Sequence, residues 1–525
     1  MLAFWNEEMS ARYLTAILLL SSSALFSLGI DWGLPHTHAW HGDSMCHTTL
    51  RAMADHFSGF TKYPPVQHVI LAVAFSPYIG WLFLRGELDL DASSMQEAFA
   101  DPVASMTVLI VITRLVGIAM AVGTVALIVR ILRRLGADTG SACMAGALFA
   151  LCSEVGFFAK LAMVDGPMLF WFAAALSALV ELTRTWKPRT GAWLGVLVAL
   201  GICTKEQIAG AWVLPPLALL ILAFRCPRHT GSPAKALLAG LLAWVLSYGF
   251  ASKLFIDPSG WAERIQQWLG EGTSAELWGG HPNTPSGHAL LLRDTALEML
   301  NAMGPGLFSL ALGLSLLALL RRAPGSWLLA LSFLSYDLFT LVSLRYVKTR
   351  FILPMVLLLA ILAGLGLASW PRRQRRWAQC GASLVLFFGL LRCLHVVQMM
   401  AADPRYEAEA FLAQTLRPGD SVEAYADDPY LPRMHVADLH LTHVAPGQMT
   451  TKALGQRAPK AIVLAPAYHW KLTASEREYI HWLQEESGYR RHTFRGAPAP
   501  QFLSADSATV LLPTIHILVD PGLNR

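Results

Sequence analysis

The stretch His41-Gly-Asp-Ser44, followed later in the same loop by Lys62-Tyr-Pro-Pro65, lies between two strongly apolar segments, 14–30 and 66–84. Loops are the parts of a fold that most often carry function, so the charged side chains of this polar loop are weighed first. Segments of this length and polarity can cross a lipid bilayer. The stretch therefore indicates a membrane protein with a polar loop after its first helix, and the rest of the chain supports that interpretation.

The composition is that of a polytopic helical membrane protein. The chain has 525 residues, of which 54% are hydrophobic and 15% charged, and the mean hydropathy is +0.45. Ordinary soluble domains are about 25% charged. The net charge of +5 is small and its basic residues cluster at helix ends, which excludes a nucleic-acid footprint. Seven cysteines in no recognisable spacing predict neither a disulfide framework nor a zinc site.

Apolar runs recur along the first 400 residues, and most approach the ~20 residues that a transmembrane helix needs. The first run lacks a convincing cleavage site, so we interpret it as a retained anchor. Run 190–205 is short and is expected to be tilted or continuous with its neighbour through a break. The expected apolar segments, about 11–13 transmembrane helices in all, are 14–30, 66–84, 105–132, 139–158, 166–183, 190–205, 208–225, 234–256, 300–320, 326–344, 351–370 and 377–399.

Clusters of Lys and Arg orient these helices, because cytoplasmic loops carry an excess of both. Basic clusters mark every second helix boundary from residue 105 onward, so the intervening boundaries are expected to face the exterior. Loops 31–65 and 257–299 are then external. One conflict remains: segment 66–84 would have both ends outside, so either it is re-entrant and broken at Pro77 or a boundary is misplaced.

The predicted domains are a transmembrane domain, 1–400, and a small soluble extracytoplasmic α/β domain, 401–525. In the transmembrane domain, 261–268 is predicted to form a short amphipathic helix. The soluble domain is expected to contain helices at 405–416 and 475–487, the second opened by a Ser475/Glu478 capping box. Its expected strands are 422–426, 461–464 and 508–512.

Several charges lie where a membrane protein seldom puts them, at predicted outer boundaries. Asp43 is either an ordinary solvated loop aspartate or a catalytic base. Asp165 is either a helix N-cap before Gly166-Pro167 or a member of a site, or both. Lys205 either snorkels to the membrane surface or contacts a phosphate. A cationic cluster at this edge suits an anionic lipid head group.

Arg350 opens an apolar helix, where a cation is unfavourable beside the helix dipole unless an anion is bound. His281 and His288 are candidates for substrate or metal binding, although a single loop histidine is more often neither. The sequence holds no Walker loop, dinucleotide fingerprint, HExxH motif or nucleophile elbow. No cofactor is therefore indicated, and a divalent metal is possible but has no ligand set.

Taken together, the motifs resemble the GT-C-type glycosyltransferases that use polyprenyl-phosphate sugars, such as the protein O-mannosyltransferases and the lipid A aminoarabinose transferases. A softer similarity lies in Asp403-Pro-Arg-Tyr406. The family usually has an acidic pair in the first loop, whereas here Ser44 follows Asp43, which puts a metal-binding role of that pair in doubt. The resemblance is carried by the loop with Asp43 and Lys62-Tyr63-Pro64-Pro65, by Lys160-Leu-Ala-Met-Val-Asp165, by Leu200-Gly-Ile-Cys-Thr-Lys205 and by Arg350-Phe-Ile-Leu-Pro354.

The resemblance implies a helical membrane fold and an inverting transfer of a sugar from a lipid phosphate to an acceptor hydroxyl on the extracytoplasmic side. It implies that Asp43 is the base and Asp165 a second acid of the site. Lys205 and Arg350, with Lys62, Tyr63 and His281, would bind the donor. The expected partners are the lipid-linked donor, membrane lipids and a lipid, glycan or protein acceptor, in a plasma (bacterial inner) membrane.

Two other classes of function stay open. A lipid or lipid-sugar transporter would also carry intramembrane charges, but it would favour internal repeats and paired interrupted helices, which the sequence lacks. A non-catalytic sensor or assembly protein would use the C-terminal domain for binding and would not need Asp43. The sequence does not identify the sugar, the acceptor or the host.

Overall fold

The protein is described from a computed structural model, in which the chain divides into two compact units. The first unit comprises Met1–Ile30, Met45–Arg85 and Val111–Leu394. The second comprises Asp31–Ser44, Gly86–Ile110 and His395–Arg525. The structure describes residues 2–41, 43–57, 63–90, 92, 95–225, 232–271, 280–466, 472–496 and 510–523.

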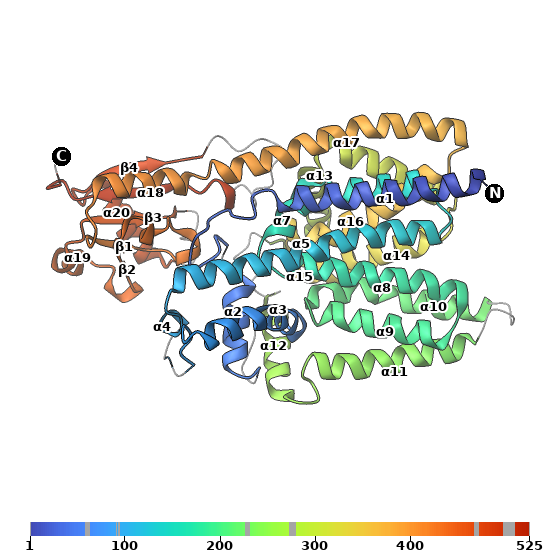
Figure 1. The fold of residues 1–525 in the computed structure, drawn as a ribbon, viewed down its shortest axis with the longest axis horizontal. Helices are drawn as coiled ribbons and strands as arrows, with labels where there is room; N and C mark the ends of the chain where they lie inside the picture. The colour runs from blue at the N-terminus through green and yellow to red at the C-terminus, as the bar shows by residue number, and fades with distance from the viewer. Residues whose placement is uncertain are drawn as a thin grey trace. The chain divides into compact units, whose positions relative to one another are not determined.

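Helices make up the first unit, and they begin and end close to the predicted apolar segments (Figure 1). Two of these helices, α5 and α17, also contain residues that belong to the second unit. The helices are α1 (Leu2–Ser27), α2 (Met45–Ala54), α3 (Pro65–Leu84), α5 (Pro102–Arg134), α6 (Thr139–Ala150), α7 (Ser153–Lys160), α8 (Asp165–Thr185), α9 (Pro188–Ile202), η1 (Glu206–Trp212), α10 (Leu214–Arg225), α11 (Pro233–Ala251), α12 (Pro258–Glu271), α13 (Pro285–Leu320), α14 (Ser326–Tyr336), η3 (Asp337–Leu341), α15 (Val342–Leu344), α16 (Thr349–Ala368) and α17 (Arg372–Ala401).

The expected class, a polytopic helical membrane protein, is confirmed. Among the described residues, nine helices are long and apolar enough to cross a membrane. The pair α6 and α7, bent by 66°, is a tenth candidate, and two shorter apolar helices, 11–27 and 188–202, accompany them. If the bent pair and both short helices also cross, the number falls within the predicted range.

Helix α16 forms the centre of the first unit. In its most apolar window 94% of the residues are buried inside the protein, against 11% for α11. Helix α11 instead exposes large apolar side chains, which suits contact with lipid tails. Because α16 is surrounded by other parts of the protein, the backbone of Arg350 and Phe351 at its start is held in place.

Helices α9 and α11 lie side by side with closely spaced backbones. Gly191 and Gly195 of α9 face the carbonyl groups of Ala236 and Gly240 on α11, and a Cβ at either glycine would overlap them. Small residues four apart permit this close packing in membrane helices. The contact fixes α9, and therefore the chain that follows its last residue, Ile202.

The structure decides between two pairs of alternatives left open by the sequence and revises one predicted loop. Segment 66–84 is one continuous helix, α3, with Pro77 inside it, and is not broken there. The run 190–225 is interrupted, because α9 ends at Ile202 and 3-10 helix η1 starts at Glu206, as one of the two alternatives expected. Residues 285–299, placed by sequence in an external loop, form the first part of α13, which kinks at Gly304. The predicted amphipathic helix is confirmed as α12.

The second unit contains a five-stranded mixed sheet in the order β2-β1-β3-β5-β4. Strand β1 is parallel to β2 and β3, whereas β5 is antiparallel to β3 and β4. The strands are β1 (Ser421–Ala424), β2 (His440–His443), β3 (Ala461–Leu464), β4 (Arg490–Phe494) and β5 (Ile515–Val519), and the helices are α4 (Met95–Ala98), α18 (Pro404–Thr415), α19 (Thr451–Arg457) and α20 (Ala474–Glu485), with short 3-10 turns η4 (Asp428–Tyr430), η5 (Met434–Ala437) and η6 (Pro446–Gln448).

Alternate residues of β3 serve the two faces of the sheet, as the period of a strand requires. Ala461 and Val463 pack with Leu412 of α18. Ile462 and Leu464 pack on the opposite face with residues of α19 and α20, among them Leu454 and Leu483. The α/β class expected for 401–525 is confirmed, while the predicted domain boundary at 400 stays a prediction.

The predicted strand at 508–512 is wrong, since Val510 and Leu511 are helical. Pro513 cannot donate a ladder hydrogen bond, and the uninterrupted run Ile515–Val519 after it forms the strand instead. The capping box of α20 lies two residues earlier than predicted. Thr473 is the N-cap and Glu476 its partner.

We expect Gly195→Leu to destabilise the first unit by about 1–3 kcal/mol, the usual cost of overpacking a close contact. The matched control is Gly313→Leu, because a Cβ at Gly313 in α13 would meet no atom within 4 Å. Thermal unfolding of both variants in the same detergent is the measurement. Equal melting temperatures would show that the α9–α11 contact is not tight.

Candidate active site

Asp165 is the first residue of α8 and is fully buried in the first unit. Its side chain does not cap the helix, because the N-cap residue is Val164 and no side-chain cap bond is made. Instead Asp165 Oδ1 accepts a hydrogen bond of 2.6 Å from Lys205 Nζ. Of the two interpretations of Asp165, the structure therefore excludes the simple N-cap.

Lys205 lies in the break between α9 and η1, with an extended backbone (φ −156°, ψ 116°). Its side chain is buried and does not snorkel, and Nζ lies 5.5 Å from the centre of the Phe351 ring. Taking two opposite charges out of water gives little net stability. An ion pair buried among apolar helices is for that reason a candidate functional feature.

The second carboxylate oxygen of Asp165 is also buried. Among the residues that the structure describes, nothing donates a hydrogen bond to Oδ2. Buried polar atoms almost always have partners. This oxygen can therefore accept a hydrogen bond from a hydroxyl group of a bound molecule while Oδ1 holds Lys205.

The residue after Lys205 forms a second buried ion pair. Glu206 Oε1 accepts a hydrogen bond of 2.9 Å from Arg264 Nε of α12. Arg264 Nη2 also donates to the carbonyl of Ser252, at the end of α11, at 2.9 Å. The pair ties the break to the amphipathic helix and to the chain that leads into it.

The next residue along the chain, Gln207, connects this segment to α14 and α16. Gln207 Nε2 donates to Tyr336 Oη, and Tyr336 Oη donates to the carbonyl of Phe351 at 2.6 Å. Thr340 Oγ1 donates to the carbonyl of Gln207 at 2.9 Å. On the other side of Lys205, the carbonyl of Cys203 accepts from Val66 N of α3 at 3.2 Å. The break 203–205 and the first two residues of η1 thus contact α3, α8, α12, α14 and α16.

Arg350 lies one residue inside the start of α16, whose N-cap is Lys348. Its guanidinium carbon lies 5.5 Å from the centre of the Phe351 ring, the ring that also faces Lys205 Nζ. Thr349 Oγ1 donates to Glu298 Oε2 of α13 at 2.9 Å. The structure thus brings three of the predicted site residues, Asp165, Lys205 and Arg350, around the start of α16.

The other predicted residues have different settings. His281 Nε2 is 2.7 Å from Asp294 Oδ2, and its backbone N–H donates to the carbonyl of Arg345. Tyr63 is half-buried just before α3, and Lys62 lies outside the described residues. Asp43 belongs to the second unit and is half-buried, with its backbone N–H donating to His41 Nδ1 at 3.2 Å. No group of three potential metal ligands occurs among the described residues.

Two buried cations hold the chain just after α1. Lys160 Nζ donates to the carbonyl of Leu28 at 2.7 Å, and Arg114 Nη1 donates to the carbonyl of Ile30. Arg114 is not among the residues predicted from the sequence, although a charge inside an apolar run is itself a signal. The pairing of Glu206 with Arg264 was not predicted either, because its only signal in the sequence was an acid beside a candidate lysine.

The second unit contains a cluster of histidines around Asp428. His443 Nε2 lies 2.8 Å from Asp428 Oδ1, and His38 Nδ1 lies 3.8 Å from Oδ2. His36 is buried, with ring centroids 5.9 Å from His38 and 5.5 Å from His435. The hydrogen bond to Asp428 raises the pKa of His443, whereas burial lowers the pKa of His36 to about 3.

We expect single substitutions of the buried pair to cost about 3–5 kcal/mol, because each leaves an uncompensated charge. Asp165→Leu and Lys205→Met should each destabilise the protein, and the double variant should recover most of the loss. The control is Glu485→Leu, which breaks a half-exposed pair with Arg491 and should cost at most ~1 kcal/mol. Thermal unfolding in detergent measures all four, and a double variant less stable than both singles would contradict the pairing.

The folded-state pKa of His36 lies below its usual 6.5, so folding favours its neutral form. Its contribution to stability is present above pH 6.5 and decreases as the pH falls toward 3. His443 acts in the opposite direction, since its raised pKa favours the folded state at low pH. We therefore expect wild type to lose more stability than His36→Phe between pH 7.5 and 5, with the exposed His440→Phe as control. Parallel melting curves for wild type and His36→Phe would contradict this.

No family model matches the sequence, and no curated protein matches it. Among solved structures, ArnT from Cupriavidus metallidurans bound to undecaprenyl phosphate aligns over 97% of this chain and 98% of its own, at 11% identity and a TM-score of 0.53. The apo state of that protein aligns over 98% and 99% at 10% identity, with a TM-score of 0.49. The oligosaccharyltransferase of Archaeoglobus fulgidus with zinc and sulfate aligns over 85% and 68% at 12% identity, with a TM-score of 0.45.

An alignment over almost the whole of both chains at so low an identity shows a shared fold. The likeness to the bound form of ArnT covers the helical unit and the C-terminal sheet together. The resemblance proposed from the sequence motifs is therefore confirmed for the fold, and this chain is a multi-pass membrane protein of the GT-C fold.

Proposed function

We propose that this protein is an inverting glycosyltransferase that moves a sugar from a polyprenyl-phosphate donor to an acceptor hydroxyl on the extracytoplasmic side. The buried Asp165–Lys205 pair is the observation that carries the proposal, because it combines a fixed ammonium group with an unused carboxylate oxygen. These are the groups that a sugar phosphate needs, a cation for the phosphate and an acceptor for a hydroxyl. The similar fold of ArnT, solved with undecaprenyl phosphate, supports a lipid phosphate as the donor's carrier.

The donor phosphate would lie against Lys205 and Arg350, whose charged groups both lie 5.5 Å from the centre of the Phe351 ring. An ammonium group has three donors, so Lys205 can hold Asp165 with one and a phosphate oxygen with another. Lys62, Tyr63 and His281 complete the proposed donor contacts. Of these, His281 is the least suited, since its Nε2 already contacts Asp294.

The reaction needs one displacement. The acceptor oxygen attacks the anomeric carbon, the bond from that carbon to the phosphate oxygen breaks, and the phosphate leaves with the electron pair. Asp43 takes the proton of the attacking hydroxyl as general base. Lys205 and Arg350 stabilise the charge that develops on the phosphate, where preorganised cations act most strongly. Attack from the face opposite the phosphate inverts the configuration.

Asp165 has two tasks in this proposal. It orients Lys205, and its free oxygen accepts a hydrogen bond from a sugar hydroxyl of the donor. Asp43 is suited to the base role because it lies in a polar loop and is only half-buried. The proposed setting is a plasma membrane, and the acceptor is a lipid, a glycan or a protein.

We expect Asp43→Asn to lower the rate of sugar transfer by about 10²–10⁴-fold, the usual contribution of a general base. The assay offers radiolabelled polyprenyl-phosphate sugars to the purified protein in lipid nanodiscs with a membrane extract as acceptor source. Asp31→Asn is the matched control, because Asp31 is an exposed acid at the other end of the same loop.

Full transfer by Asp43→Asn would remove Asp43 as the base and direct attention to Asp165. Lys205→Gln should weaken binding of polyprenyl phosphate itself, measured by displacement of a labelled lipid. Movement of the donor across the bilayer of proteoliposomes, without any transfer, would contradict the enzyme and favour a lipid-sugar transporter.

A further inference from the structure

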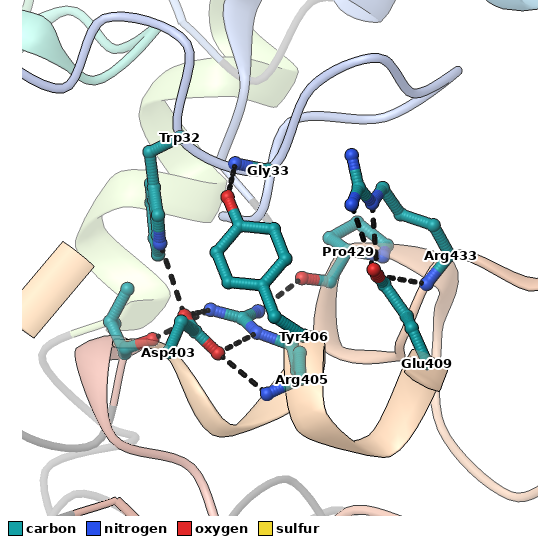
Figure 2. A network of polar contacts seen from close by, with 9 residues as sticks. Trp32, Gly33, Asp403, Arg405, Tyr406, Glu409, Pro429 and Arg433 are labelled. Carbon is teal, nitrogen blue, oxygen red and sulfur yellow. Dashed lines mark hydrogen bonds and ion pairs between the residues drawn. The ribbon is translucent and has the colours of Figure 1, made fainter. Parts of the chain in front are cut away.

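The loop 31–44, which contains Asp43, is bound to the start of α18 (Figure 2). Trp32 Nε1 donates to Asp403 Oδ2 at 3.1 Å. The backbone N–H of Gly33 donates to Tyr406 Oη at 2.9 Å. Asp403 is also the N-cap of α18, so the beginning of the loop and the beginning of this helix share one carboxylate.

A fully buried arginine lies beneath the loop. Arg405 binds both oxygens of Asp403, with Nε at 3.0 Å and Nη2 at 2.7 Å. It also donates to the carbonyls of Pro429 and Val510. Its guanidinium carbon lies 4.0 Å from the centre of the Trp40 ring, a cation–π contact at close range.

A second arginine holds the middle of the loop. Arg433 Nη1 donates to the carbonyl of Leu34 at 2.6 Å, and its other nitrogens bind Glu409 at 2.9 and 2.7 Å. Its guanidinium carbon lies 5.6 Å from the Trp40 ring and 5.1 Å from the Tyr406 ring. Trp40 is therefore enclosed by two cations and by Tyr406, whose ring centroid is 4.9 Å away.

Asp43 follows Trp40 by three residues, and backbone bonds make that connection short. His41 N donates to the carbonyl of Ala39 at 2.7 Å, and Ser44 N donates to the carbonyl of His41 at 3.3 Å. Asp43 N donates to His41 Nδ1. Because these bonds join His41 to Asp43 and Ser44, we expect a displacement of Trp40 to move Asp43 as well.

We propose that Trp40, Arg405 and Tyr406, here called the Trp40 clamp, position Asp43 for catalysis, so that side chains of the C-terminal domain fix the loop that carries the proposed base. This inference rests on the proposed role of Asp43 as the base. The clamp residues do not touch substrate in this proposal and act only through the loop. Sub-ångström placement of a base matters, because a displacement of about 1 Å can cost 10²-fold in rate.

The composition of the clamp favours a positioning role over a purely stabilising one. Replacing a buried ion pair by apolar side chains of similar volume is often neutral or stabilising. A loop that only had to be held in place would be stabilised as much by apolar packing. What the bidentate Arg405–Asp403 pair and the ring contacts of Trp40 add is a fixed orientation of the loop.

The test compares Tyr406→Phe with Tyr489→Phe. Each removes one hydroxyl that bonds to the backbone in the same unit, but Tyr489 Oη donates to the carbonyl of Pro459, away from the loop. We expect Tyr406→Phe to lower kcat about 5–10-fold and Trp40→Ala about 100-fold. The KM for the lipid-linked donor should stay within about twofold of wild type, and Trp40→Phe should recover most of the rate.

Hydrogen–deuterium exchange of amides 33–44 provides a readout that does not depend on activity. We expect faster exchange there in Tyr406→Phe and Trp40→Ala, and wild-type exchange in Tyr489→Phe. Faster exchange with an unchanged kcat would overturn the positioning role.

A double-variant cycle separates this proposal from the proposed function. If the clamp acts through Asp43, adding Tyr406→Phe to Asp43→Asn should cause little further loss of transfer. An equal fold-loss in both backgrounds would overturn the clamp while leaving Asp43 as base. Wild-type transfer by Asp43→Asn would instead overturn the base role, and the clamp would then have no catalytic group to position.

Discussion

The first unit depends on one interruption, the non-helical residues 203–205 between α9 and η1. In a continuous helix, neighbouring side chains point in directions about 100° apart and their backbone groups are occupied. At Lys205 the backbone is extended, so neighbouring side chains can point in other directions and backbone groups can bind other helices. Lys205, Glu206 and Gln207 consequently bind α8, α12 and the pair α14 and α16, while the carbonyl of Cys203 is free to bind α3.

The interruption also explains why charge is tolerated so deep in an apolar bundle. Asp165 and Arg264 neutralise Lys205 and Glu206, and each pair is supported by further hydrogen bonds or by an aromatic face. The glycine contact between α9 and α11 fixes the helix that precedes the break. The buried helix α16 fixes Phe351, whose ring faces Lys205. Rigid helices thus hold an irregular segment, which is the arrangement that membrane proteins use for polar sites.

Much of this could be predicted from the sequence, because hydropathy and charge act locally. The apolar runs predict the helices. Because charges are rare at the outer ends of such helices, Asp165, Lys205 and Arg350 could be predicted as site residues. That Asp165 and Lys205 form a pair could not be predicted, since forty residues separate them and the contact depends on how α8 meets the break. The strand misplaced at 508–512 has a similar cause: partners of β5 lie far away in sequence, and only their pairing selects Ile515–Val519.

In the second unit, a short motif that is weak in the sequence makes several specific contacts in the structure. Asp403-Pro-Arg-Tyr406 is unremarkable as a motif, yet its three polar side chains all contact the loop 31–44 or support a residue that does. The burial of Arg405 could not be predicted from its own stretch of sequence, because its partners other than Asp403, namely Trp40, Pro429 and Val510, come from three distant segments. The same contacts that make Arg405 invisible to sequence analysis tie the C-terminal sheet to the loop of Asp43. A domain joined to a loop in this way can change the activity of an enzyme without contributing a single atom to its chemistry.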